Sequence, residues 1–449
     1  MKIYGIEKKK IIRAFRNGEI NVAVYGLGKI GLPLAAIFAE KGANVIGVDV
    51  NRKVVESVNR GKNYIKEEPG LDEIVKKNVK SGKLSATVDA VKASQNSDVM
   101  IVIVPVLLSE NNFPNLNPLK SVSTNIAKGL EKGDFVILES TIPPGTTKKV
   151  VKPLLEKSRL KASTDFGLAY CPERVSSGHA IRDITHSYPK IVGGIDEKSS
   201  KTTEALYSRI TSNRIIVTDS ITAEIAKLFQ GLYRDVNIAL ANELAMYCEQ
   251  KGIDFFEAKK IGNTDPFCNI HDAGAGVGGH CIPVYPYFVT KTTKTDTSLI
   301  ELARKVNDSM PSHMVDLIKN GLNSAGKTIK DSNILILGLA YRGGVKEARN
   351  SPAIPIIKIL QNSGANVYLY DPLFSREEIK EYDVKYTNDI KNMDCAVIVA
   401  DHKEFYDLDW EKIEGKMRTK VVVDGRQVVD PKKMKELGFV YRGIGRAHD

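Results

Sequence analysis

The chain has 449 residues, of which 42% are hydrophobic and 27% charged, and 65 Lys and Arg against 54 Asp and Glu give a formal net charge of +11. This length favours two or three domains, and the composition is that of a folded globular protein. No stretch approaches the roughly 20 apolar residues of a membrane helix, and the basic residues are interleaved with acidic ones, so we expect neither a membrane segment nor nucleic-acid binding.

Residues 1–20 are basic and amphipathic but lack the continuous apolar stretch of a secretory signal. We therefore expect a cytoplasmic protein with an N-terminal extension. After it, short β-rich runs alternate with helical ones, as in NVAVYGLG, ANVIGVDV, SDVMIVIVPV, GDFVILES and FGLAYCP. This alternation predicts βαβ units and a parallel sheet covered by helices on both faces.

From about Thr222 the pattern changes to one long helical period that ends at Gly252. Such a helix is too long for a crossover and indicates a spine between domains. The βα alternation resumes after about residue 325, with SNILILGLAY, ANVYLYDP, MDCAVIVA and KVVVDGRQVV. The predicted fold is α/β, with two Rossmann-like doubly wound parallel-sheet domains joined by a central helical domain; the expected boundaries are 1–215, 216–322 and 323–449.

A dinucleotide fingerprint follows the first strand, where Gly26, Gly28 and Gly31 have the GxGxxG spacing. These glycines permit a tight turn, close approach to a pyrophosphate and close helix packing, while the helix start offers N–H groups to the phosphates. Asp49 ends the second strand about 20 residues later, where a carboxylate binds the ribose and disfavours a 2′-phosphate. We predict NAD as the cofactor, contacted by Gly26, Gly28, Lys29, Ile30, Gly31 and Asp49.

The five cysteines are odd in number and form no CxxC pair, so neither a disulfide framework nor a metal site is expected. Cys248 and Cys395 lie in apolar runs and are interpreted as core residues. The surroundings of Cys171 and Cys268 are ambiguous, and we expect core or loop packing for each. Cys281 differs because it follows Gly278, Gly279 and His280. His280 and backbone N–H groups would favour its thiolate, so we predict a nucleophile.

NAD and a nucleophilic cysteine together suggest two successive oxidations of an alcohol, through an aldehyde and a thioester to an acid. At this point the sequence resembles the UDP-glucose and GDP-mannose dehydrogenases, especially the branch that acts on UDP-N-acetylhexosamines. The resemblance covers nearly the whole chain, through GLGKIGLPLA, ESTIPPGTT, YCPERVSSG, AKLFQGLYRDVNIALANE, GVGGHC, GLAYRGGVKEARNSPA and YDP.

The resemblance implies oxidation of the sugar C6 hydroxymethyl with two NAD, the thioester forming on Cys281. It implies that Lys227 stabilises the oxyanion and that Glu173 and Thr141 handle the catalytic water, with Thr141 also beside the cofactor. It further implies that residues 1–215 bind NAD, that 216–322 carry the cysteine loop, and that 323–449 bind the UDP-sugar. The implied substrate contacts are Arg174, Val175, Lys227, Arg234, Gly278, Tyr341, Arg342, Arg349 and Arg426.

Three positions depart from the family pattern: Gly231 stands where Asn is usual, Tyr285 where Asp is usual, and Phe267 where an Arg reaches a neighbouring subunit's sugar. The Tyr285 hydroxyl, or His271, could replace a lost polar contact. The expected activity is oxidation of a UDP-N-acetylhexosamine, with UDP-N-acetyl-D-mannosamine or UDP-N-acetyl-D-glucosamine preferred, in a homodimer formed through the long helix.

Three alternatives stay open at the level of the sequence. One is a UDP-glucose 6-dehydrogenase. The second is a two-electron nucleotide-sugar oxidoreductase in which Cys281 is dispensable. The third is a sugar-nucleotide binding protein without activity, which the complete NAD fingerprint disfavours.

Overall fold

The computed structural model describes residues 1–65, 67–176 and 178–447. The chain divides into two compact units, the first of Met1–Phe229 with Tyr287–Thr293 and the second of Gln230–Pro286 with Lys294–Asp449. The predicted α/β class with two Rossmann-like parts is confirmed. The three predicted domain boundaries stay a prediction.

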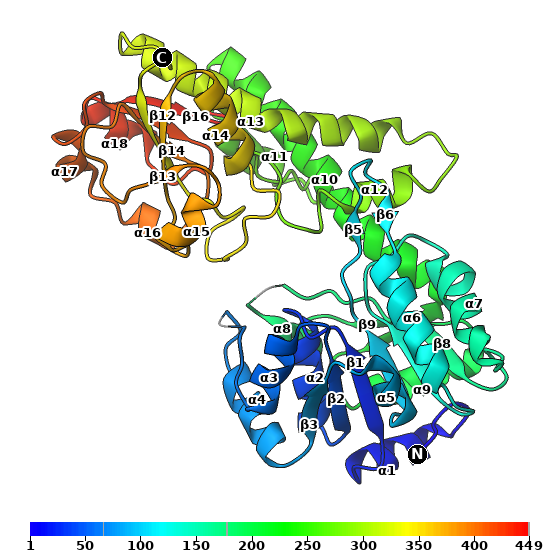
Figure 1. Ribbon diagram of the computed structural model, residues 1–449. Helices are drawn as coiled ribbons and strands as arrows, with labels where there is room; N and C mark the ends of the chain where they lie inside the picture. Colours follow the sequence, from blue (N-terminus) through cyan, green and yellow to red (C-terminus); the bar gives the residue numbers. More distant parts are fainter. Residues whose placement is uncertain (66, 177, 448–449) are drawn as a thin grey trace. The chain divides into compact units, whose positions relative to one another are not determined.

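The first unit is built on an eight-stranded sheet in the order β10-β9-β8-β7-β4-β1-β2-β3 (Figure 1). The strands are β1 Asn21–Tyr25, β2 Asn44–Val48, β3 Leu84–Thr87, β4 Val99–Val102, β7 Phe135–Leu138, β8 Gly167–Tyr170, β9 Lys190–Gly194 and β10 Ile215–Asp219. The neighbouring strands pair in parallel except β8 and β9, which pair antiparallel. One antiparallel pair therefore interrupts the parallel sheet that the sequence predicts.

Helices cover both faces of this sheet (Figure 1). They are α1 Lys8–Arg16, α2 Gly31–Glu40, α3 Arg52–Asn59, α4 Leu71–Lys80, α5 Ala90–Gln95, α6 Asn117–Gly129, α7 Lys152–Leu155, α8 Ala180–Arg182 and α9 Glu197–Tyr207. A small β-hairpin pairs β5 Leu107–Leu108 with β6 Pro114–Asn115. Helix α12, Tyr285–Thr290, begins in the second unit and belongs to the first from Tyr287 onward.

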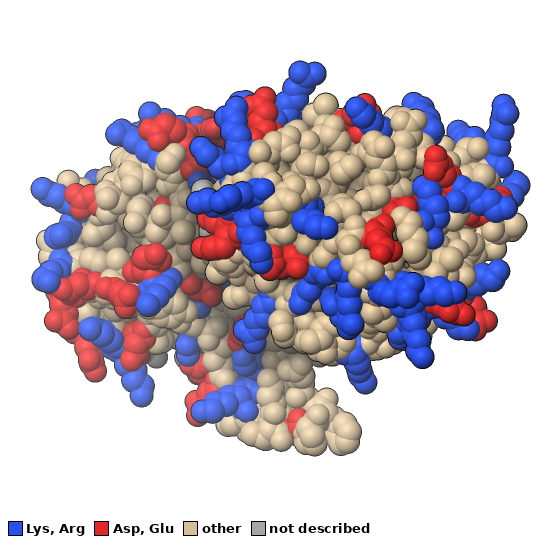
Figure 2. Space-filling view, turned by 90° about the horizontal axis from the view of Figure 1, so that it is seen from below, with Lys and Arg blue, Asp and Glu red and all other residues tan. Residues whose placement is uncertain are grey.

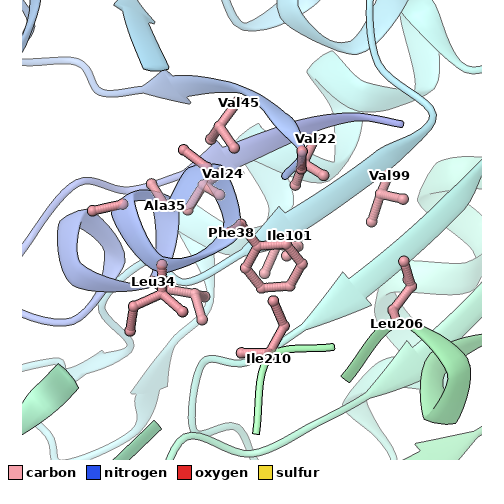
Figure 3. Close-up of a cluster of buried hydrophobic side chains, with 14 of the residues drawn as sticks. Val22, Val24, Leu34, Ala35, Phe38, Val45, Val99, Ile101, Leu206 and Ile210 are labelled. Carbon is pink, nitrogen blue, oxygen red and sulfur yellow. The ribbon is translucent and has the colours of Figure 1, made fainter. Parts of the chain in front are cut away.

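Two hydrophobic cores lie on the two faces, because successive side chains of a strand point to opposite sides. Val22 and Val24 belong to one core with Phe38, whereas Ala23 and Tyr25 belong to the other. Figure 3 shows the first core, in which α2 packs on the central strands. The N-terminal extension joins this core, because Ile11, Ala14 and Phe15 of α1 are buried and α1 packs on α9.

The second unit contains a six-stranded parallel sheet in the order β13-β12-β11-β14-β15-β16. The strands are β11 Asn333–Leu337, β12 Asn366–Tyr370, β13 Lys385–Tyr386, β14 Cys395–Ile398, β15 Val421–Asp424 and β16 Val440–Gly443. Its helices are α11 Phe255–Gly262, α13 Ser298–Ser324, α14 Ala353–Asn362, α15 Arg376–Lys380, α16 Lys403–Tyr406, α17 Trp410–Glu414 and α18 Pro431–Glu436.

The long helix predicted from Thr222 to Gly252 is α10, Ser220–Lys251. Its first turns belong to the first unit and the remainder to the second. Gly252 follows with a φ of +67°, a left-handed conformation that ends helices.

Lys and Arg side chains are interspersed with Asp and Glu over the face shown in Figure 2, as the sequence predicts. Within the described residues, no helix combines the length and apolar character needed to cross a membrane. The cytoplasmic location stays a prediction.

Candidate functional site

The loop after β1 has the geometry that a dinucleotide requires. Gly26 has a φ of +96°, and a Cβ added at Gly31 would lie 1.8 Å from the Gly26 carbonyl oxygen, so both positions need glycine. A Cβ added at Gly28 would instead have no described atom within 4 Å. The backbone at Gly28 is therefore open to a close ligand, and α2 begins three residues later at Gly31. Its N-cap residue, Ile30, makes no side-chain cap to the helix N–H groups.

Asp49 is half-buried at the end of β2 and points to the same loop. Its Oδ2 accepts a hydrogen bond from the Leu27 amide at 2.9 Å, and its Oδ1 accepts one from the Asn51 amide at 2.8 Å. Backbone donors thus fix a carboxylate beside the glycines, where a ribose hydroxyl can donate to its remaining acceptor positions.

Two contacts of this loop are not foreshadowed by any sequence pattern. Tyr64 donates its hydroxyl to the Leu27 carbonyl, and Lys29 lies 3.4 Å from the Glu67 carboxylate. Both partners come from the segment between α3 and α4, which carries no motif. The open glycine, the helix start and the oriented carboxylate together fit NAD.

The first unit brings Lys227 and Glu173 together. Lys227 lies on α10, is 7% exposed, and donates to the Glu173 carbonyl. Its Nζ also lies 3.7 Å from the Glu173 carboxylate, whose Oε1 accepts from the Val175 amide at 2.5 Å. The ammonium and the carboxylate predicted to act in catalysis are therefore neighbours.

Thr141 and Glu173 follow neighbouring strands, because Thr141 comes after β7 and Glu173 after β8. The Glu173 amide donates to the Glu139 carbonyl at 3.4 Å, which links the two strand ends. The sheet therefore places the two residues predicted to handle water at the carboxyl ends of neighbouring strands.

A buried ion pair, which no sequence pattern indicates, ties these two strand ends. Lys190 lies 3.0 Å from the carboxylate of Glu139, which is 2% exposed, and donates to the Cys171 carbonyl at 3.2 Å. Tyr207 donates its hydroxyl to Glu139, and the Lys190 ammonium lies 4.4 Å from the centre of the Tyr207 ring. Charged groups are buried when such partners satisfy them, and this cluster holds the ends of β7 and β8 in register.

Arg174 already has protein partners in the first unit. Its guanidinium donates to the Pro189 carbonyl and lies 5.6 Å from the centre of the Tyr188 ring. Its predicted role in substrate binding would use the remaining donors of the planar fork.

In the second unit the cysteine loop packs closely on the loop after β11. A Cβ added at Gly278 would lie 2.4 Å from the Tyr341 Cβ, and Gly279 has a φ of +85°. The Gly279 amide donates to the Arg349 carbonyl at 2.8 Å. These glycines let Tyr341 lie directly against the backbone next to Cys281.

Cys281 is partly exposed, whereas Cys171, Cys248 and Cys395 are buried. The His280 side chain is hydrogen-bonded to Cys281, which raises the pKa of His280 although desolvation acts in the opposite direction. Burial raises the pKa of Cys171 to about 12. An imidazole next to an accessible thiol is the arrangement expected of a reactive cysteine, and Cys171 has the environment of a core residue.

The arginines predicted to bind substrate differ in their surroundings. Arg234, Arg342 and Arg349 are exposed, and the Arg342 guanidinium lies 5.7 Å from the centre of the Tyr341 ring. Arg426 instead donates to the backbone carbonyls of Val399, Gly276 and Tyr341 at 2.9, 3.3 and 3.2 Å. Arg426 therefore supports the cysteine loop, and its predicted contact with substrate would come in addition.

His271 and Phe267, two further positions noted in the sequence, have different surroundings. His271 packs edge-on to Tyr233, with ring centres 5.7 Å apart, and desolvation together with the nearby Arg234 charge lowers its pKa. Phe267 is 98% exposed.

The chain belongs to the UDP-glucose/GDP-mannose dehydrogenase family. Its NAD binding domain matches residues 20–211, its central domain residues 221–309 and its UDP binding domain residues 335–431. The protein is accordingly an NAD-dependent nucleotide-sugar dehydrogenase, an oxidoreductase, and both the predicted family and the predicted cofactor are confirmed.

Relatives of the chain include the UDP-N-acetyl-D-mannosamine dehydrogenase of Pyrococcus horikoshii, which is 39% identical over 95% of this chain and 99% of that protein. The NDP-N-acetyl-D-galactosaminuronic acid dehydrogenase of Ralstonia nicotianae is 34% identical over 92% of this chain and 97% of its own length. The solved structure of the UDP-D-ManNAc dehydrogenase from Pyrococcus horikoshii superposes with a TM-score of 0.88 at 38% identity, over 96% of this chain and 100% of that one.

Proposed function

We propose that the protein oxidises the C6 hydroxymethyl of a UDP-N-acetylhexosamine, with UDP-N-acetyl-D-mannosamine the best candidate, to the carboxylate in two steps of two electrons each. The observation that carries the proposal is the partly exposed Cys281, held in a glycine loop beside His280 and Tyr341, in a chain that also has an NAD loop. The sugar assignment is supported by the similarity to UDP-N-acetyl-D-mannosamine dehydrogenases.

The chemistry balances with two NAD for each sugar. NAD, when bound, supplies the hydride acceptor for both oxidations. Loss of a hydride and a proton converts the hydroxymethyl to an aldehyde, and the Cys281 thiolate then forms a C–S bond to the aldehyde carbon. Loss of a second hydride from that carbon gives a thioester, and water displaces the thiolate to give the carboxylate.

The charged residues of the first unit have matching roles in this proposal. The Lys227 ammonium stabilises the oxyanion that develops on the C6 oxygen, since a fixed cation shielded from water is effective at that task. Glu173 takes the proton of the attacking water while Thr141 orients it. Glu139 and Lys190 hold the two strand ends that carry these residues.

Substrate binding is assigned to the arginines and their neighbours. Arginine suits a diphosphate because its planar fork donates to two oxygens at once. Arg234, Arg342 and Arg349 have exposed side chains for this purpose, and Tyr341 presents a ring beside the cysteine loop. Arg174, Val175, Gly278 and Arg426 complete the predicted contacts.

The proposal is tested by counting NADH formed per sugar consumed, with limiting UDP-N-acetyl-D-mannosamine, UDP-N-acetyl-D-glucosamine, UDP-N-acetyl-D-galactosamine or UDP-glucose. The wild-type protein should form two NADH per molecule of an N-acetylated sugar. Cys281→Ala should form at most one, because no thioester can arise. Cys268→Ser is the matched control, since Cys268 is also partly exposed, and should still form two. Two NADH from Cys281→Ala would exclude the cysteine route.

We also propose that the protein is a homodimer formed through α10. Tyr233, Leu240 and Tyr247 are 52%, 49% and 56% exposed, and their spacing of seven residues places them on one helix face. Large apolar side chains gathered on one exposed face are typical of protein interfaces. Sedimentation at micromolar concentration should give twice the chain mass, and a monomer would contradict the assignment.

A further inference from the structure

Gly231 is a glycine inside the 32-residue helix α10, where glycine is an unfavourable residue. A Cβ added there would lie 2.5 Å from Cδ2 of Tyr285 and 3.4 Å from its Cβ and Cγ. Two side-chain carbon atoms that are not bonded do not approach to 2.5 Å, so the Tyr285 ring already occupies the space of a side chain at 231. The glycine is needed because of Tyr285.

Tyr285 lies one helical turn after Cys281. The Cys281 carbonyl accepts hydrogen bonds from the amides of Val284 at 3.1 Å and Tyr285 at 3.0 Å, so residues 281–285 form one closed turn. Tyr285 is 7% exposed, which means that its ring is packed and not free to rotate in solvent. Contact of this ring with α10 therefore fixes the turn that carries the thiol.

The other side of Cys281 is anchored independently. The Gly279 amide donates to the Arg349 carbonyl at 2.8 Å, and the Asn350 side-chain amide donates to the Gly279 carbonyl at 2.8 Å. The cysteine thus lies between an upstream anchor on the loop after β11 and a downstream anchor on α10. A thiol held on both sides keeps its direction, which a nucleophile needs.

We propose that Gly231 and Tyr285 form a matched positioning pair, in which the Tyr285 ring seats on the glycine of α10 and thereby orients Cys281. The inference rests on the proposed role of Cys281 as the nucleophile. It also joins two departures from the family pattern into one change, since the ring at position 285 excludes any side chain at position 231.

The test is a double-mutant cycle with Gly231→Ala and Tyr285→Ala. Gly231→Ala should lower kcat at least tenfold when Tyr285 is present, because the new methyl group displaces the Tyr285 ring from its position against α10. The KM for NAD should change less than twofold. Tyr285→Ala should itself be slow, and adding Gly231→Ala to it should change kcat less than twofold. Equal effects of Gly231→Ala in both proteins, or full activity of Gly231→Ala alone, would overturn the pair.

Two further variants separate ring seating from a role of the Tyr285 hydroxyl and from a general effect of alanine. Tyr285→Phe keeps the ring and should retain kcat within twofold, whereas a tenfold loss would assign the role to the hydroxyl and contradict ring seating. Gly262→Ala is the matched control, because a Cβ there would lie 3.7 Å from Ile270 in ordinary contact. It should leave kcat, KM and the melting temperature unchanged.

A readout that needs no turnover distinguishes failure of the pair from failure of the proposed function. The rate at which iodoacetamide alkylates the Cys281 peptide, measured by mass spectrometry, should change at least threefold in Gly231→Ala and not in Gly262→Ala. Suppose that Cys281→Ala still forms two NADH per sugar, while the alkylation rate changes in Gly231→Ala and not in Gly262→Ala. The pair then positions Cys281, and the thioester route is wrong. Unchanged alkylation in Gly231→Ala would overturn the pair itself.

Discussion

Two loops of the chain share the pattern GLxxxG at the carboxyl end of a strand, residues 26–31 after β1 and residues 338–343 after β11. Gly26 and Gly338 have similar positive φ angles, +96° and +106°. The second loop, however, has the buried Ala340 where the first has the open Gly28. Its next helix, α14, begins only at Ala353, whereas α2 begins within the first loop at Gly31.

The acidic residues that follow the next strands, Asp49 after β2 and Asp371 after β12, also differ in their exposure and their partners. Asp49 is half-buried and is held by backbone amides. Asp371 is 1% exposed and accepts from the Leu339 and Ala340 amides at 2.7 and 2.9 Å and from His402 Nε2 at 3.0 Å. The same backbone turn thus leaves room for a dinucleotide in one place and is closed by the protein's own groups in the other.

The largest expected effect comes from closing the first loop. The Cβ of Gly28→Val would have no described protein atom within 4 Å, so the fold should persist while the Kd for NAD rises at least 100-fold, about 2.8 kcal/mol. Calorimetry measures the Kd and thermal melting the fold. Ala340→Gly, the matched change in the second loop, should leave one NAD per chain. A second bound NAD in that variant would show that the two loops differ by this residue alone.

The two acidic residues should respond in opposite ways to the same substitution. Asp49→Asn should weaken NAD binding about tenfold through loss of a charged acceptor, with little change in stability. Asp371→Asn should leave NAD binding unchanged. It should cost about 1–3 kcal/mol of folding free energy, because the buried donors around position 371 lose the carboxylate that accepts their hydrogen bonds. Denaturant unfolding and calorimetry on both variants test this, and the reverse result would refute the comparison.

The smallest effect concerns acid stability, where Asp394 is informative. Burial alone would raise the pKa of Asp394, but hydrogen bonds from Arg418, Asn333 and Thr419 outweigh it and lower the pKa to about 2. A carboxyl group with a lowered pKa stabilises the fold at pH values above its ordinary pKa of 3.8. This stabilisation is lost as the pH falls toward 2.

Asp394→Asn should therefore reduce the loss of stability between about pH 4 and pH 2 by about 1 kcal/mol after screening by solvent. Asp98, whose Oδ2 accepts from the Asn21 amide as that of Asp394 accepts from Asn333, provides the matched Asn variant. Acid unfolding followed by circular dichroism measures both. An unchanged acid transition in Asp394→Asn would contradict the assignment.

Features encoded by local patterns could be predicted from the sequence. The glycine spacing and Asp49 identified the NAD loop, strand alternation identified the sheets, and the helix predicted from Thr222 to Gly252 matches α10 within two residues at its start. Cys171 is indeed a core residue. These features depend on short-range geometry, which the order of residue types specifies directly.

Features that depend on distant partners could not be predicted. The pair of Glu139 and Lys190 is 51 residues apart in sequence, and no periodicity links the two residues. The antiparallel direction of β9 depends on the path of the chain before it, since the strand's own composition is the same either way. In the sequence, Gly231 and Tyr285 are two separate departures from the family pattern. Their contact can be recognised only from the fold, which brings the two residues together.

The central claim, that Cys281 carries the sugar as a thioester, is tested most directly by trapping. Glu173→Gln should slow the attack of water, so the variant can be mixed with NAD and UDP-N-acetyl-D-mannosamine, quenched in acid and digested for mass spectrometry. The account predicts a Cys281 peptide that bears the acyl sugar nucleotide and releases it to hydroxylamine. An unmodified Cys281 peptide, in a protein whose wild-type form still makes two NADH per sugar, would contradict it.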